Sequence, residues 1–134
     1  MSEQMTQDPR MTQNITIARD VAEHIKSGAT DDSSIWAKHW SNDCVSIECD
    51  GSEHKGLDAI RTKCEKWMNE TTLHSCEVDG PYANAEGFSL KYTLDCESKV
   101  GLFPRMTMSE IATYTVEGGK VTRESFMLEP MPGM

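Results

Sequence analysis

The chain has 134 residues, 37% of them hydrophobic, and a formal net charge of −9 at neutral pH. That length suits a single domain, and the excess of acidic residues disfavours nucleic acid or an anionic membrane surface as a partner. No apolar run approaches the ~20 residues that a membrane-spanning helix requires.

Three helices are predicted in the first half of the chain. Residues 1–11 show no periodicity, so we expect a flexible N-terminal tail there. Apolar residues then recur at helical spacing from Thr12 to Ser27, from about Asp31 to Trp40, and from Leu57 to about Glu70. The second and third helices are separated by a predicted strand, Cys44 to Cys49, and by a polar turn.

The second half of the chain is predicted to form strands, because apolar and polar residues alternate along it. The expected strands cover residues 72–78, 88–96, 106–116 and 121–128. Residues 117–120 form a hairpin loop, and the proline-containing residues 129–134 form a short C-terminal tail. Three helices followed mainly by an antiparallel meander are typical of an α+β domain, which we place at residues 12–128.

The uncovered face of such a sheet predicts a partner. Ile111, Thr113 and Thr115 form one β-branched, uncharged face of their strand. A homodimer through the sheet is the simplest cover for that face. The five cysteines match no zinc or redox spacing, and residues 1–10 contain no apolar secretory segment, so we expect free thiols and a cytoplasmic location.

Several short segments, in order, resemble the nuclear transport factor 2-like superfamily and, within it, the SnoaL-like proteins. They are Trp40-Ser-Asn-Asp43, Ser46-Ile-Glu48, Gly51-Ser-Glu-His-Lys-Gly56 with Ala59-Ile60, and Tyr114-Thr-Val-Glu-Gly-Gly-Lys-Val121 with Phe126. The resemblance implies a cone-shaped, curved antiparallel or mixed sheet of the cystatin-like barrel type, packed against the three helices around an internal pocket. It also implies dimerisation through the sheet. The family includes isomerases, cyclases, dehydratases and proteins without known activity, so it indicates fold more than function.

Three glutamates are the candidate catalytic residues. Glu110 and Glu124 each lie on an otherwise apolar strand face, where a carboxyl must be paired, protonated or turned toward a cavity. They share a face if the hairpin loop has three residues and lie on opposite faces if it has two. Glu48 occupies the position where the steroid-isomerase pattern of the family has its base. A solvated or structurally hydrogen-bonded carboxylate remains the alternative for each of the three.

The expected ligand-binding residues surround these acids, and they are Trp36, His39, Trp40, His54, Met108, Tyr114 and Phe126. His39 is also compatible with a satisfied core position. No histidine pair has metal-ligand spacing, so we predict neither a metal site nor a cofactor.

Two functions remain open on this evidence. The first is an enzyme that isomerises, cyclises or dehydrates a small hydrophobic metabolite by carboxylate acid–base chemistry. The alternative is a non-catalytic ligand-binding or dimeric accessory module. A catalyst requires a carboxyl group with a shifted pKa, whereas a binding module requires only shape and apolar walls.

Overall fold

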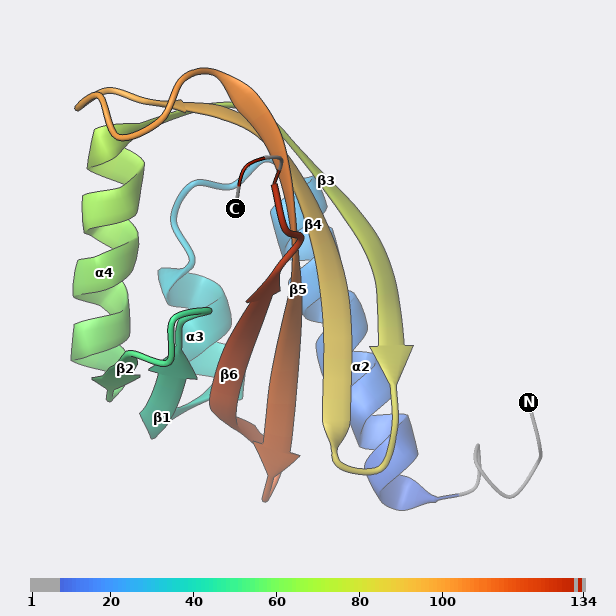
Figure 1. Cartoon of the computed structure of the whole chain (residues 1–134). Helices are drawn as coiled ribbons and strands as arrows, with labels where there is room; N and C mark the ends of the chain where they lie inside the picture. Colours follow the sequence, from blue (N-terminus) through green and yellow to red (C-terminus); the bar gives the residue numbers. More distant parts are fainter. Residues whose placement is uncertain (1–7, 132, 134) are drawn as a thin grey trace.

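The computed structural model describes residues 8–131 and 133, which form three helices and one six-stranded sheet (Figure 1). The helices are α2 (Pro9–Lys26), α3 (Ser33–His39) and α4 (Leu57–Glu70). The strands are β1 (Trp40–Ile47), β2 (Glu53–Lys55), β3 (Thr71–Ala83), β4 (Gly87–Ser98), β5 (Met106–Glu117) and β6 (Lys120–Leu128). None of the helices in the described range is long and apolar enough to cross a membrane.

The sheet is mixed and open, with strand order β2-β1-β6-β5-β4-β3. Only the β1–β6 pair is parallel, and all other neighbours are antiparallel. Figure 1 shows the long strands curving over one side of the molecule, with α4 standing apart from them at the other side. The predicted α+β architecture of three helices on a curved mixed sheet is therefore confirmed.

The hydrophobic core lies between the helices and the inner face of the sheet. Strand β4 buries every second residue there: Phe88, Leu90, Tyr92, Leu94 and Cys96. Helix α2 packs its buried stripe, which includes Ile17, Ala18 and Val21, against β3 and β4. The alternation that predicted the strand therefore also places the core.

Two elements begin or end at residues other than those predicted. Helix α2 begins at Pro9, three residues before the expected start, since Asp8 caps it by accepting a hydrogen bond from the Arg10 N–H at 2.8 Å. Strand β1 begins at Trp40 and ends at Ile47, rather than covering Cys44 to Cys49. Glu48 consequently lies in the turn after the strand, where its N–H donates to the Ser52 carbonyl at 2.9 Å.

Two further differences concern short or interrupted strands. Residues 53–55, expected as part of a turn, form the edge strand β2. Strand β3 continues past Gly80-Pro81 to Ala83, with a register irregularity between Asp79 and Tyr82. A proline is tolerated there because β3 is the other edge of the sheet and needs no partner on one side.

Candidate functional site

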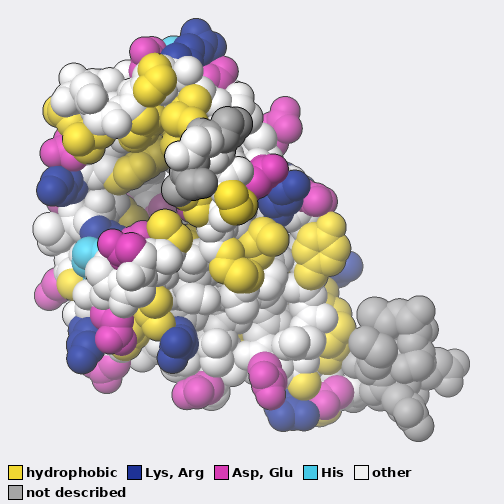
Figure 2. All heavy atoms as spheres, viewed as in Figure 1, with side chains coloured by type: hydrophobic (Ala, Val, Ile, Leu, Met, Phe, Trp, Pro, Cys, Tyr) yellow, Lys and Arg dark blue, Asp and Glu magenta, His cyan; other side chains and the backbone are white. Residues whose placement is uncertain are grey.

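A cavity of about 1370 Å³ lies between α4, the segment 28–33 and the inner face of the sheet. Figure 2 shows hydrophobic side chains gathered around a hollow in the upper part of the molecule, on the side where α4 stands. Eight of the predicted site residues line the cavity: Trp36, Trp40, Glu48, Met108, Glu110, Tyr114, Glu124 and Phe126.

The other two predicted residues, His39 and His54, are not among the lining residues. His39 is buried, and its Nε2 lies 2.9 Å from the Asp20 carboxylate of α2. The same carboxylate accepts a hydrogen bond from Lys38 at 2.7 Å. His39 is thus a core residue with its hydrogen-bonding need met, and it is not among the residues that line the cavity. His54 contacts one of the lining residues, since its Nε2 lies 3.5 Å from the Glu48 carboxylate.

The register of the sheet explains why the acids meet. His54, Ser46, Glu124 and Tyr114 are successive cross-strand partners on β2, β1, β6 and β5. Residues directly opposite one another point to the same face. This row therefore carries Glu124 and Tyr114 side by side on the inner face, with Ser46 fully buried next to Glu124.

Glu110 and Glu124 share this face, the arrangement expected for a three-residue hairpin loop. The loop nevertheless has only two residues, for which opposite faces were expected. Glu117 pairs with Lys120, which leaves a two-residue turn, Gly118-Gly119, and both glycines have positive φ. A bulge follows, because Val116 pairs with Val121 but Thr115 pairs with Arg123. The extra residue restores the register that brings both glutamates inward.

Lys63 of α4 contacts Glu48 and, by its positive charge, lowers the pKa values of Glu110 and Glu124. Its ammonium group donates to Glu48 at 2.5 Å and to the Ser46 hydroxyl at 2.7 Å, and it lies 4.6 Å from the centre of the Phe126 ring. Ser46 is also the cross-strand partner of Glu124, and its hydroxyl group lowers the pKa of that carboxyl group. The half-buried ammonium group of Lys63 thus partly compensates the negative charge of a site that contains three carboxyl groups.

Burial raises the pKa of both acids that lie on the sheet, Glu110 and Glu124. Glu124 is only 6% exposed, and burial raises its pKa to about 7 against the opposing influence of Lys63 and Ser46. Burial and the negative charge of Glu48 also raise the pKa of Glu110. Glu124 therefore changes its protonation state near neutral pH, as an acid–base catalyst must.

Two tyrosine hydroxyls lie beside the acids. Tyr92 and Tyr114 are buried, and their hydroxyl oxygens are 2.7 Å apart. Each is a cross-strand partner of a glutamate, Tyr92 of Glu110 and Tyr114 of Glu124. Burial raises the pKa of both phenols, so they stay protonated and can donate hydrogen bonds.

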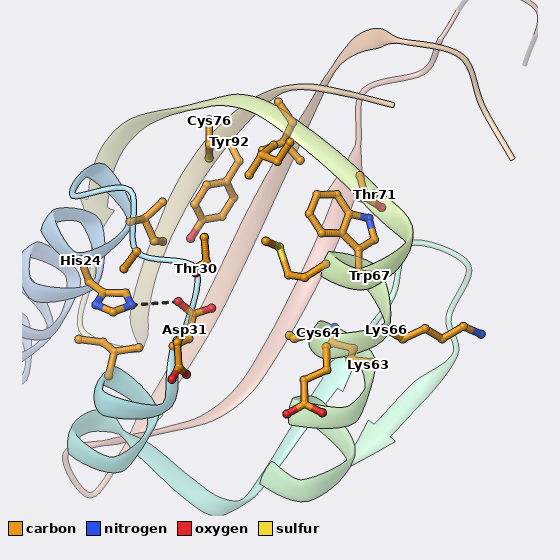
Figure 3. A pocket seen from close by; sticks show the side chains of 18 of the residues that line it. His24, Thr30, Asp31, Lys63, Cys64, Lys66, Trp67, Thr71, Cys76 and Tyr92 are labelled. Atoms are coloured by element: carbon orange, nitrogen blue, oxygen red, sulfur yellow. Dashed lines mark hydrogen bonds and ion pairs between the residues drawn. The ribbon is translucent and has the colours of Figure 1, made fainter. Parts of the chain in front are cut away.

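The remaining walls combine apolar and aromatic side chains with polar and charged ones. Figure 3 shows the Tyr92 ring entering the cavity from the sheet, while Trp67 and Cys64 project from α4 opposite it. On the side of α2, His24 Nε2 lies 2.9 Å from Asp32 and ties that helix to the segment before α3. Burial raises the pKa of the Cys64 thiol to about 12, which leaves it a neutral wall residue.

The sequence prediction missed Lys63, Tyr92 and Ser46, yet two of them carry a readable signal. Lys63 follows Ile60 by three residues and precedes Trp67 by four, so it falls on the apolar stripe of α4. Tyr92 occupies an inward position of the most regular strand. Within the described residues, no group of three or more His, Cys, Asp or Glu side chains is arranged to hold a metal ion.

Comparison with known proteins places this pocket in a family. The family model for the SnoaL-like domain matches residues 15–128. A proposed SnoaL-like polyketide cyclase from Mesorhizobium loti is 33% identical, with a TM-score of 0.77, and the match covers 84% of this chain and 97% of that one. No curated protein matches the chain significantly.

More distant structures share the fold. A proposed SnoaL-like polyketide cyclase from Jannaschia sp. has a TM-score of 0.71 at 13% identity, covering 92% of this chain and 90% of its own. A proposed isomerase from Bacillus subtilis has a TM-score of 0.66 at 16% identity, covering 90% and 89%. At these identities the similarity extends to the architecture alone.

Proposed function

We propose that this chain, which belongs to the SnoaL-like domain family and has a small-molecule pocket, is an enzyme. The proposed reaction is the formation of an enolate from a hydrophobic ketone. The observation that carries the proposal is the position of Glu124. This glutamate is buried in the wall of the cavity, beside a pair of tyrosine hydroxyls, and its pKa is raised to about 7.

Glu124 is the proposed general base. Because its pKa is near neutrality, it is ionised in a useful fraction of molecules and yet basic enough to remove a carbon-bound proton. Glu48, which the sequence resemblance favours as base, is about one third exposed and paired with Lys63. We propose that Glu48 fixes the position of Lys63 and that Glu110 forms part of the cavity wall beside Tyr92.

The tyrosine pair is the proposed oxyanion site. One hydroxyl proton is used between Tyr92 and Tyr114, so the other remains for a ligand oxygen. A donor that is already oriented toward a developing negative charge lowers the barrier more than one recruited from water. The neutral phenols are suited to this task because their own pKa values are raised by burial.

The reaction needs only side-chain groups. The Glu124 carboxylate takes a proton from the carbon next to the ketone, and the C–H electron pair moves to the carbonyl oxygen, which the tyrosine pair stabilises. Protonated Glu124 then returns the proton to another carbon, which isomerises the substrate. Alternatively, the enolate carbon attacks a second carbonyl of the same molecule, which closes a ring while Glu124 protonates the new alkoxide.

The walls and the relatives support a sizeable hydrophobic substrate. Trp36, Trp40 and Phe126 give the cavity aromatic surfaces, and its volume is of the order of the larger ligand pockets. The relative with 33% identity is a proposed polyketide cyclase, and ring closure of a polyketide proceeds through such an enolate. A non-catalytic binding module would gain nothing from a buried glutamate with a raised pKa, because burying an ionisable group generally costs stability.

The test uses 3-cyclohexen-1-one, whose isomerisation to the conjugated ketone is followed by ultraviolet absorbance. We expect the wild-type rate to rise with pH and to level off above the pKa of Glu124, about 7. Glu124→Gln should lower the rate by about 10²–10⁴-fold and Tyr92→Phe by roughly 10²-fold.

The matched control is Glu117→Gln, which changes an exposed glutamate at the end of β5, away from the cavity. It should retain the wild-type rate. A wild-type protein no faster than buffer, or a Glu124→Gln variant as fast as wild type, would reject the proposed reaction.

A further inference from the structure

One carboxyl group in the cavity wall has no partner in the protein. Glu110 is half-buried and lines the cavity, and within the part of the chain that the structure describes no hydrogen bond or ion pair reaches its side chain. The other two acids differ, since Glu48 forms an ion pair and Glu124 lies under the influence of the Ser46 hydroxyl. We infer that Glu110 binds a hydroxyl group of the substrate, which is therefore a hydroxylated ketone. The inference rests on the proposed function, which places the reacting carbonyl at Glu124.

The nearest neighbours of Glu110 on the sheet offer its carboxyl group no hydrogen-bond donor. On its own strand face Glu110 lies between Met108 and Ala112. Its cross-strand partners are Tyr92 and Leu128. Three of these four side chains are apolar, and the Tyr92 hydroxyl lies 2.7 Å from the other hydroxyl of the tyrosine pair. Water or a ligand must therefore satisfy the Glu110 carboxyl group.

The charges around Glu110 favour a neutral ligand group over a cationic one. Burial and the negative charge of Glu48 raise the pKa of the Glu110 carboxyl group, whereas the positive charge of Lys63 lowers it. Lys63 is thus near enough to repel a second cation, which would also lose its hydration among apolar side chains. The thiols and phenols near Glu110 stay neutral, because burial raises their pKa values. A hydroxyl group suits this place, since it can donate to a carboxylate and accept from a protonated carboxyl group.

The separation of Glu110 and Glu124 along the sheet indicates the length of the ligand. Glu124 is directly opposite Tyr114, which follows Glu110 by four residues on β5. At about 3.4 Å per residue, the two positions are roughly 14 Å apart at the backbone. The row between them is apolar, since it consists of Ala112 and Phe126. A ligand with its ketone at Glu124 and its hydroxyl at Glu110 is therefore longer than a single six-membered ring and apolar in the middle.

The rival explanation is that water alone solvates Glu110 and that a bound ligand leaves this water in place. A hydroxyl group on the ligand would then add nothing to its affinity. If the ligand displaces the water, an analogue without the hydroxyl group leaves the carboxyl group unpaired, which lowers its affinity. The affinities of two ligands that differ only in this hydroxyl group therefore separate the two explanations.

The experiment measures the dissociation constants of 4-(4-hydroxyphenyl)cyclohexanone and 4-phenylcyclohexanone by isothermal titration calorimetry. The first ligand has a hydroxyl group at the end away from the ketone, and the second lacks it. We expect wild-type protein to bind the hydroxylated ligand more tightly, by about 10-fold. Glu110→Leu should abolish this preference, because it removes the acceptor. Glu110→Gln should keep part of the preference, because the amide oxygen still accepts a hydrogen bond.

The matched control is Glu77→Leu, the same substitution at an exposed position of β3 that does not line the cavity. It should show the wild-type preference. Equal affinities of the wild-type protein for the two ligands, a preference that persists in Glu110→Leu, or no binding of either ligand would overturn the inference. Because binding is measured without turnover, a protein that prefers the hydroxylated ligand but does not accelerate the isomerisation would reject the proposed reaction and retain the role of Glu110.

Discussion

The two faces of the β5–β6 hairpin differ sharply although their residues alternate along the same two strands. The inner face carries Glu110, Tyr114 and Glu124, which are buried or half-buried around the cavity. The outer face carries Ile111, which is 41% exposed, opposite Met127, which is 59% exposed. At these positions, titratable groups lie where water is scarce and large apolar groups lie where water is abundant.

This inversion indicates which positions serve the fold and which serve another purpose. Burying an ionisable group opposes folding, and exposing a large apolar side chain forgoes the stability that its burial would give. A chain selected for stability alone would reverse both choices. We propose acid–base chemistry as the reason for the glutamates of the inner face, and association with another surface as the reason for the exposed apolar pair of the outer face.

The largest effect should come from an inner position that serves the fold alone. Leu90 of β4 is fully buried in the core, whereas its neighbour Lys91 is exposed on the outer face. Leu90→Ala should lower the free energy of unfolding by about 3 kcal/mol, because it leaves a cavity. Lys91→Ala should change it by less than about 0.5 kcal/mol. Urea denaturation measures both, and similar losses in the two variants would contradict the assignment of faces.

An inner position that serves chemistry should behave in the opposite way. The pKa of Glu124 is raised in the folded state from 4.5 to about 7, so folding binds its proton more tightly. The stability that this proton provides is fully present below the unfolded pKa and is lost as the pH rises through about 7. Above that pH, the wild-type protein carries a buried negative charge at Glu124, and the Glu124→Gln variant does not.

We therefore expect Glu124→Gln to be more stable than wild type near pH 8, by about 1–3 kcal/mol, and similar to wild type near pH 4. Denaturation at the two pH values tests this, with Glu117→Gln as the exposed control whose effect should not depend on pH in this way. A Glu124→Gln variant that is less stable than wild type near pH 8 would show that the carboxylate stabilises the fold, contrary to this prediction.

The contrast between the faces was only partly predictable from sequence. Period-two alternation identified β4, β5 and β6 and the inward position of Glu110, because side-chain direction follows directly from it. It could not fix Glu124 relative to Glu110, since that depends on a bulge for which the sequence gives no clear signal. The three residues of β2 are too few to show any period.

Other errors had different physical causes. Lys63 lies on the apolar stripe of α4, but charged residues on helices are usually solvated. Its partners, Ser46 and Glu48, come from β1 and the following turn. His39 has aromatic neighbours in sequence that suggested a ligand site. Its partner, Asp20, is on a different helix. Local patterns thus located the elements, whereas the partners of polar groups depended on tertiary contacts.

The smallest effect on the fold, and the sharpest test of the outer face, is expected at Ile111. This residue and its cross-strand partner Met127 are both exposed, and the hydroxyls of Thr113 and Ser89 lie beside them, 3.1 Å apart. Lys91, the β4 partner of Ile111, adds one charge at the side of this group. The four uncharged side chains suit a flat contact between two copies of the sheet. A homodimer through this face remains our prediction.

Ile111→Glu should alter the free energy of unfolding of dilute protein by less than about 0.5 kcal/mol, because the side chain already contacts water. In a two-fold dimer, the same substitution places a new charge on both sides of one interface, where repulsion and desolvation oppose association. Sedimentation should show wild-type dimer and variant monomer at the same micromolar concentration. A wild-type monomer under these conditions would refute the dimer, and the exposed Ile111–Met127 pair would then be an apolar surface without an assigned partner.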